Sequence, residues 1–286
     1  MYLRTLYSKM KLIFITANPE HAATADKAGV DRVMVDLEIL GKEARQGHLD
    51  TVISGHTLDD VAAVKRVLKA AELLVRVNPV HAGSAAEIDA VIAAGAQRLM
   101  LPMFRHPKDV GTFLDIVDGR LPTVLLLETS TALARLPQIL EIPGVEEIHI
   151  GLNDLHLELQ LDFMFELFPS GLLDHVAAQM LGANIPFGVG GVARLGQGML
   201  PAELILSEHT RLGSSAVILS RDFVQALNVE GAFAAEVARL RAHVDELSKA
   251  SPQSLEAARR KVAKGALDIA ETLRARRSLN GKKQTP

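Results

Sequence analysis

The chain has 286 residues, of which 48% are hydrophobic and none is cysteine, and its formal net charge is −3. A chain of this length can bury an ample core in one large domain, and its weak acidity gives no support to nucleic-acid binding. The lack of cysteine excludes disulfides, thiolate nucleophiles and cysteine-ligated metals. No apolar run reaches the roughly 18 residues of a membrane span and the N-terminus does not resemble a signal peptide, so we expect a cytoplasmic protein with no membrane partner.

Short runs rich in valine, isoleucine and leucine recur along the chain and predict buried parallel strands. The runs are residues 12–18, 32–38, 73–79, 98–104, 123–129, 147–154, 185–191 and 215–221. Segments with helical spacing separate most of them, which is typical of parallel βα units. Eight such units predict an α/β fold, a (β/α)8 TIM barrel over residues 1–247. The alternative is an open doubly wound sheet, but the first turn lacks the glycines that usually mark one.

Local residue patterns predict where several helices begin and end. The segments Thr57-Leu-Asp-Asp60 and Ser84-Ala-Ala-Glu87 both have the spacing of a capping box before a helical run. Gly29 and Gly95 stand where a helix must stop before the next strand.

A C-terminal helical extension is predicted over residues 248–277, after the break at Ser251-Pro252. Its apolar residues form one helical stripe: Leu255, Ala258, Val262, Ala266, Ile269 and Leu273. Either the chain's own barrel or a neighbouring subunit must cover that stripe, and the sequence leaves both open. Residues 278–286 are predicted to be a disordered tail.

Two of the apolar runs end in a carboxylate, Glu128 after the fifth and Asp154 after the sixth. Catalytic groups gather at the C-terminal ends of barrel strands, and neighbouring strands lie about 4.8 Å apart. The two carboxylates could therefore share one divalent cation, and oxygen ligands favour Mg²⁺ or Mn²⁺ over Zn²⁺. The alternative is structural: one acid caps a helix and the other pairs with a lysine or arginine.

Arg76 lies within the third run, where its guanidinium could bind a substrate carboxylate or form a structural pair with an acid such as Glu38. Asp36 and Glu38 end the second run, and strand alternation points them to the same side. One of them could hold Arg76 or accept a hydrogen bond from metal-bound water. Lys42 and Arg45 follow, either near the same end of the barrel or as solvated loop charges.

Other features give weaker indications. The glycine-rich residues 188–198 suggest a flexible lid or tight packing more than a phosphate site. His156 is either a proton carrier near the barrel mouth or an ordinary helix-start histidine. No nucleophile-elbow serine is visible, and no predicted strand has an interior lysine, since Lys11 only precedes the first; this argues against an imine mechanism.

Five segments, read in order, resemble the HpcH/HpaI aldolase and citrate lyase β subunit-like family. They are Val35-Asp-Leu-Glu38, Val75-Arg-Val-Asn78, Leu99-Met-Leu-Pro-Met103, Leu127-Glu128-Thr129 and Gly151-Leu-Asn-Asp154-Leu155. The resemblance implies a divalent metal on Glu128 and Asp154 and a substrate carboxylate or carbonyl near Arg76. From it we expect catalytic roles for Arg76, Glu38 and Asp36, and substrate contacts from Arg76, Asn78, Gly151 and Asn153. It also implies a homo-oligomer, a trimer or hexamer with exchanged C-terminal helices.

Two departures from the family pattern stand out. The first strand lacks the Arg-Ser-x-Leu-Phe-Val-Pro-Gly type of segment that serves acyl-CoA binding in citrate lyase-like members, and Ile39 stands where the oxoacid aldolases have a histidine. We therefore expect a Mg²⁺- or Mn²⁺-dependent carbon–carbon lyase of the class II aldolase type, acting on a small 2-oxo or hydroxy acid through a metal-stabilised enolate. An acyl-CoA lyase of the same fold and a non-catalytic barrel paralogue are the alternatives.

Overall fold

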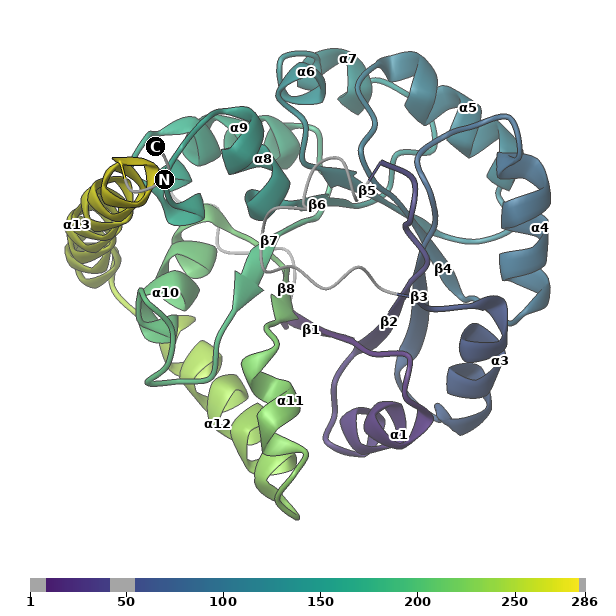
Figure 1. Ribbon diagram of the computed structural model, residues 1–286, viewed down its shortest axis with the longest axis horizontal. Coiled ribbons are helices and arrows are strands. Elements are labelled where there is room, and N and C mark those ends of the chain that lie inside the picture. Colours follow the sequence, from purple (N-terminus) through teal and green to yellow (C-terminus); the bar gives the residue numbers. More distant parts are fainter. Residues whose placement is uncertain (1–8, 42–54, 283–286) are drawn as a thin grey trace.

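Eight parallel strands close into a barrel in the computed structural model, which describes residues 9–41 and 55–282. The strands follow the order of the sequence, and the helices form a ring outside them (Figure 1). This confirms the predicted (β/α)8 TIM barrel. The strands are β1 (Lys11–Ile15), β2 (Arg32–Asp36), β3 (Glu72–Arg76), β4 (Arg98–Leu101), β5 (Thr123–Leu127), β6 (Ile148–Ile150), β7 (Phe187–Val192) and β8 (Ala216–Leu219).

The helices that cover the barrel vary from one turn to eight. They are α1 (Pro19–Lys27), α3 (Leu58–Val67), α4 (Ser84–Ala93), α5 (Pro107–Val117), α6 (Ser130–Leu133), α7 (Leu136–Leu140), α8 (Leu152–Glu158), α9 (Leu172–Gly182), α10 (Ala202–Leu212), α11 (Asp222–Ala226), α12 (Ala232–Leu247) and α13 (Pro252–Lys282), with a 3-10 turn η1 (Met164–Leu167). Lys42 and Arg45 lie outside the described residues.

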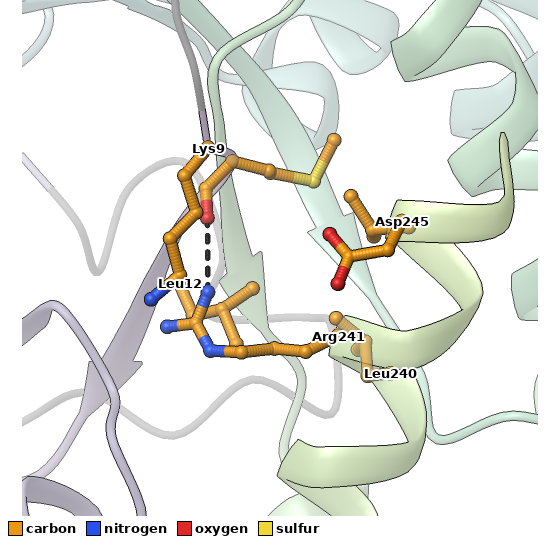
Figure 2. Close-up of a pocket in the computed structure, with 7 residues that line it drawn as sticks. Lys9, Leu12, Leu240, Arg241 and Asp245 are labelled. Atoms are coloured by element: carbon orange, nitrogen blue, oxygen red, sulfur yellow. Dashed lines mark hydrogen bonds between the residues drawn. The ribbon is translucent and has the colours of Figure 1, made fainter. Parts of the chain in front are cut away.

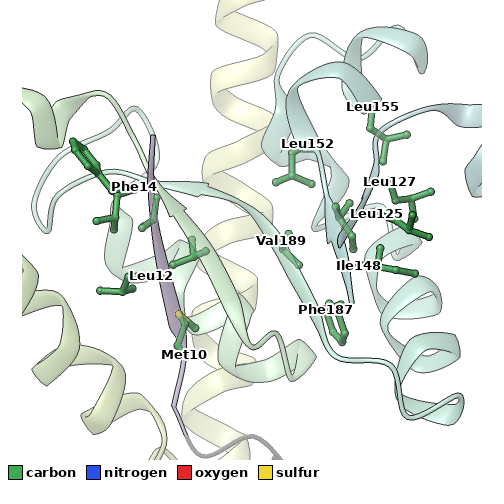
Figure 3. Packing of buried hydrophobic residues seen from close by; sticks show 14 of the residues in the cluster. Met10, Leu12, Phe14, Leu125, Leu127, Ile148, Leu152, Leu155, Phe187 and Val189 are labelled. Atoms are coloured by element: carbon green, nitrogen blue, oxygen red, sulfur yellow. The ribbon is translucent and has the colours of Figure 1, made fainter. Parts of the chain in front are cut away.

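Two apolar layers hold the barrel together, because successive strand residues point to opposite sides. Inside, Ile13, Met34, Leu74, Met100, Val124, Leu126 and Ala216 pack into one buried cluster. The outward residues form a larger core with the helices. Leu12 and Phe14 of β1 contribute to it on one side of the barrel, and Leu125 and Ile148 on another (Figure 3).

The sixth strand is shorter than the sequence predicted, and this moves one site residue. The strand stops at Ile150, Gly151 caps α8, and Asp154 lies in the first turn of that helix rather than at a strand end. The apolar run continues from strand into helix without a break, and periodicity alone does not separate the two in so short a segment.

The capping predictions had mixed outcomes. Thr57 and Asp60 form the expected box, with the Asp60 carboxylate accepting from the Thr57 N–H at 2.8 Å. The box at Ser84 was wrong, because Gly83 caps α4 and Glu87 binds the backbone and side chain of Asn78 instead.

Helix α13 packs against α10 and η1 of its own chain (Figure 1). Val262, Ala266 and Ala270 are its buried contacts, and Gly265 lies so close to the Leu200 side chain that a Cβ there would come within 2.8 Å of it. Its own barrel therefore covers the stripe, and the oligomer stays a prediction. The helix continues to Lys282, while residues 283–286 of the predicted tail lie outside the described residues. No helix in the described part of the chain is long and apolar enough to cross a membrane.

A set of charged side chains, which we call the basal network, closes the N-terminal end of the barrel. It consists of Lys11, Arg32, Glu72, Arg98 and Glu147. Arg32, 2% exposed, donates to both oxygens of Glu147 at 2.5 and 2.8 Å and to Glu72 at 2.8 Å. Lys11 proves to be the first residue of β1, 3.7 Å from Glu147 and far from the strands' C-terminal ends.

A hollow of about 200 Å³ also lies at this N-terminal end, between the start of β1 and α12 (Figure 2). Arg241 spans it and donates to the carbonyl oxygens of Met10 and Gly29 and to the carboxylate of Asp31. Because those structural bonds already engage the guanidinium, we do not place the functional site here.

Candidate active site

Arg76 is the centre of the charged group at the opposite end of the barrel, where β2 and β3 finish. Its Nε and Nη2 donate to the two carboxylate oxygens of Asp36 at 2.8 and 2.7 Å. Glu38 Oε2 lies 3.4 Å from Nη1, so both acids face the guanidinium as strand alternation predicted. Burial alone would lower the pKa of Arg76, but the bonds and charges of Asp36 and Glu38 raise it, and the guanidinium stays charged.

Glu128 follows β5 and is 2% exposed. Its Oε1 accepts the backbone N–H of Met103 at 3.1 Å, and Met103 adopts a left-handed φ of 52° to present it. A non-glycine residue in that region of backbone space stores strain, which is commonest at functional sites. Burial raises the pKa of Glu128 well above its usual value; Arg76 opposes the shift, while Asp154 and Glu38 add to it.

Gly151 leaves the space that Glu128 occupies. A Cβ at this position would lie 2.7 Å from both Cβ and Oε2 of Glu128, which is closer than real side chains approach. Gly151 therefore contributes to the site by having no side chain. Three residues later Asp154, 9% exposed, lies in the first turn of α8 and contributes to the electrostatic field at Glu128.

These five side chains, Asp36, Glu38, Arg76, Glu128 and Asp154, form what we call the mouth cluster. Electrostatic coupling links Glu128 to Arg76, Asp154 and Glu38, so the sequence-predicted residues from β2, β3, β5 and α8 do come together. In the part of the chain that the structure describes, no group of three or more histidine, aspartate or glutamate side chains is arranged to hold a metal ion. Glu128 and Asp154 remain as a pair of buried carboxylates near each other.

Asn78 lies beside this cluster, but its side chain contacts other parts of the chain. Its Oδ1 accepts the backbone N–H groups of Ile39 and Leu40 at 2.9 and 3.0 Å. Its Nδ2 donates to Glu87 at 2.8 Å, and Glu87 also lies 3.0 Å from the His81 ring. In this arrangement Asn78 fixes the chain that leaves β2 immediately after Glu38.

Two histidines and Asn153 lie around the cluster. Asn153 is exposed at the start of α8. His156 is buried on the same helix, its Nδ1 bonds the Leu152 carbonyl at 3.2 Å, and burial lowers its pKa, so the structural interpretation fits it better than proton transfer. The sequence analysis missed His56, whose Nδ1 accepts the Asp36 N–H at 3.4 Å. Its distance from Asp36 along the chain gave no local pattern that could have indicated this contact.

For the glycine-rich stretch the sequence left a flexible lid or tight packing open, and Gly188 and Gly190 serve tight packing. A Cβ on Gly188 would come within 2.9 Å of Ala216 and within 2.8 Å of the His149 ring. A Cβ on Gly190, which has a φ of 43°, would come within 2.7 Å of the Leu152 side chain. His149 thus points into the barrel, where its Nε2 donates to the Gly190 carbonyl at 3.0 Å and burial lowers its pKa to about 4.

Solved structures share this barrel at low sequence identity. An HpcH/HpaI aldolase from Desulfitobacterium hafniense DCB-2 is 16% identical with a TM-score of 0.59, covering 85% of this chain and 95% of its own. A citrate lyase from Burkholderia xenovorans LB400 is 14% identical with a TM-score of 0.60, covering 85% and 78%. The citrate synthase SbnG is 15% identical with a TM-score of 0.58, covering 83% and 95%. At such identities the likeness shows the fold alone.

The sequence itself carries the family relationship. No curated protein matches the chain. The family model for HpcH/HpaI aldolase/citrate lyase matches residues 10–163, more than half of the 286, and that stretch contains every member of the mouth cluster. The protein therefore belongs to the HpcH/HpaI aldolase/citrate lyase family.

Proposed function

We propose that this protein is a divalent-metal-dependent carbon–carbon lyase of the class II aldolase type, acting on a small 2-oxo or hydroxy acid. Its family is one of lyases. The finer proposal rests on two buried carboxylates, Glu128 and Asp154, that lie near each other at the C-terminal end of the barrel. The guanidinium of Arg76, held by Asp36, lies at the same end. That end is where barrel enzymes build their active sites.

The charge of the mouth cluster supports a cation site. Among the described residues, Asp36, Glu38 and Glu128 face the Arg76 guanidinium and Asp154 adds negative charge at Glu128. Burial and the neighbouring acids together raise the pKa of Glu128, and Arg76 does not offset them. Glu128 and Asp154 would hold Mg²⁺ or Mn²⁺, since Mg²⁺ usually takes one or two protein carboxylates and keeps several waters. A cation bound there supplies Lewis-acid stabilisation of negative charge on a carbonyl oxygen.

Arg76 would bind the substrate's carboxylate or carbonyl oxygen. A guanidinium has five N–H donors in a fixed plane, so among the described residues the two bonds to Asp36 and the ion pair with Glu38 engage only part of its donor set, and the others would bind an anion. Asp36 and Glu38 hold that plane in one orientation and keep the charge in place. His56 Nδ1 accepts the Asp36 N–H, so its imidazole lies next to the cluster and is our candidate for proton exchange with a bound substrate.

Titration calorimetry with Mn²⁺, in the presence and absence of oxalate or pyruvate, tests the proposal. The wild type should bind Mn²⁺ and then the oxo acid, and Glu128→Ala and Asp154→Ala should each lose both. Asp60→Asn, which removes a carboxylate from the α3 capping box, is the control and should bind like the wild type. A wild type that binds neither Mn²⁺ nor oxalate would overturn the proposal and favour an acyl-CoA lyase or a non-catalytic barrel.

A further inference from the structure

We propose that Glu158 is a positioning residue that fixes the separation between Glu128 and Asp154. The inference rests on the cation site of the proposed function. Glu158 is the last residue of α8, four residues after Asp154, so the two side chains project from the same face of one helix. The metal-binding interpretation left Glu158 without a role.

The Glu158 carboxylate bonds to two other loops at the barrel mouth. Its Oε2 accepts the N–H and the hydroxyl of Ser130 at 2.7 and 2.8 Å, and Ser130 stands two residues after Glu128. Its Oε1 accepts Arg105 Nη2 at 2.5 Å. We call the three residues Arg105, Ser130 and Glu158 the clamp.

The loops that meet at the clamp are also joined to each other beneath it. The chain after β4 runs from Met103, whose N–H binds Glu128, through Phe104 to Arg105. The Thr129 hydroxyl, fully buried, donates to the Phe104 carbonyl at 2.7 Å. The segment after β4 is thus bonded to the residues that follow β5, and Glu158 bonds both of them to α8.

The clamp would keep Glu128 and Asp154 at a fixed separation when no cation is bound. Two buried carboxylates that share a cation repel each other when the cation is absent, and the loops that carry them would move apart. The pKa of Glu158 indicates that the clamp stays charged: burial alone would raise it, but the bonds from Ser130 and Arg105 hold it below its usual range. A preset spacing of Glu128 and Asp154 spares the cation the cost of ordering them.

The test is Mn²⁺ titration calorimetry on Glu158→Gln, with thermal unfolding of the metal-free protein to verify that the variant folds. The substitution keeps the size of the side chain but removes the charge that binds Arg105. We expect Mn²⁺ affinity to fall about tenfold, the usual effect of removing a group that orients metal ligands. Glu166→Gln is the matched control, since Glu166 accepts two backbone N–H groups at 2.8 Å in the η1 turn, which carries no mouth carboxylate.

The outcomes separate this inference from the proposed function. If the wild type fails to bind Mn²⁺, the cation site itself is wrong and the role of Glu158 falls with it. If the wild type binds and Glu158→Gln binds equally well, or if Glu166→Gln weakens binding as much, the positioning role is overturned while the cation site stands. Should Glu158→Gln not fold, Ser130→Ala removes a single clamp bond and should still weaken Mn²⁺ binding by severalfold; unchanged affinity would again overturn the inference.

Discussion

The two ends of the barrel both carry buried charge, but they balance it differently. The basal network has three cations for two carboxylates, joined by short bonds such as those from Arg32 to Glu147. Within the described part of the chain, the mouth cluster has one cation, Arg76, and four carboxylates. Strands β2 and β3 contribute to both ends, with Arg32 and Glu72 at their first positions and Asp36 and Arg76 at their last.

The difference shows in the acids themselves. Burial would raise the pKa of Glu147, but the bonds and charge of Arg32 outweigh it and hold the pKa below its usual value. Burial also raises the pKa of Glu128, and there it prevails, because Arg76 cannot offset desolvation together with Asp154 and Glu38. A network that keeps its buried acids ionised stabilises the fold, whereas a buried acid with a raised pKa is typical of a functional site.

The largest expected effect comes from breaking the basal network with Glu147→Gln. Removing this carboxylate leaves Arg32 buried without its main partner, and breaking a buried pair in this way costs about 3–5 kcal/mol of unfolding free energy. Urea denaturation at pH 7 measures the loss. Mn²⁺ affinity should not change, and weaker Mn²⁺ binding at unchanged stability would contradict the division of roles between the two ends.

A second prediction concerns His149, which is buried inside the barrel between its two ends, where protonation should destabilise the folded protein. The pKa of His149 is about 4 in the folded protein, and an unfolded histidine titrates near 6.5. Between those values only the unfolded chain takes up the proton, so the folded state loses about 3 kcal/mol as pH falls from 6.5 to 4. His149→Gln retains a donor for the Gly190 carbonyl and should make the decline shallower.

Urea denaturation at several pH values between 7 and 4 gives the two curves for His149→Gln and the wild type. The pKa of His209 is lowered to about 3, mainly by burial and further by His149, so His209 contributes a decline that is largely common to both proteins. Parallel curves for the two proteins would show that His149 is not held neutral by its burial.

The smallest expected effect is on the stability of the Glu128→Gln variant, and it tests the difference between Glu128 and Glu147. Because the folded pKa of Glu128 lies above the unfolded one, its ionisation costs stability as pH rises through the folded value. Without metal, Glu128→Gln should therefore be about 1 kcal/mol more stable than the wild type at pH 7, and this advantage should vanish below the unfolded pKa of about 4.3. Urea denaturation in EDTA at pH 7 and pH 4 tests this, and a less stable variant at pH 7 would contradict it.

The sequence predicted the fold and most of the mouth well, for a physical reason. Continuous apolar runs identify buried parallel strands, and polar residues that end such runs, like Arg76 and Glu128, lie at the functional end of a barrel. The basal network was missed because Arg32 and Glu147 stand at strand starts, where their pairing depends on barrel closure. The clamp on Glu158 was missed for a similar reason, since its partners lie 28 and 53 residues away along the chain.

The pairing of β2 with β3 has a consequence for folding. Strand β2 begins with Arg32 and ends with Asp36, and β3 begins with Glu72 and ends with Arg76. In the observed register Arg32 aligns with Glu72, and Asp36 aligns with Arg76. If the register between β2 and β3 shifted by one residue, the charged side chains of one strand would point toward the helices. If it shifted by two, neither Glu72 nor Asp36 would have a cation opposite it. The charges of the mouth cluster and of the basal network therefore also destabilise incorrect strand registers. A chain in which Asp36 and Arg76 have paired must already have β2 and β3 in the correct register.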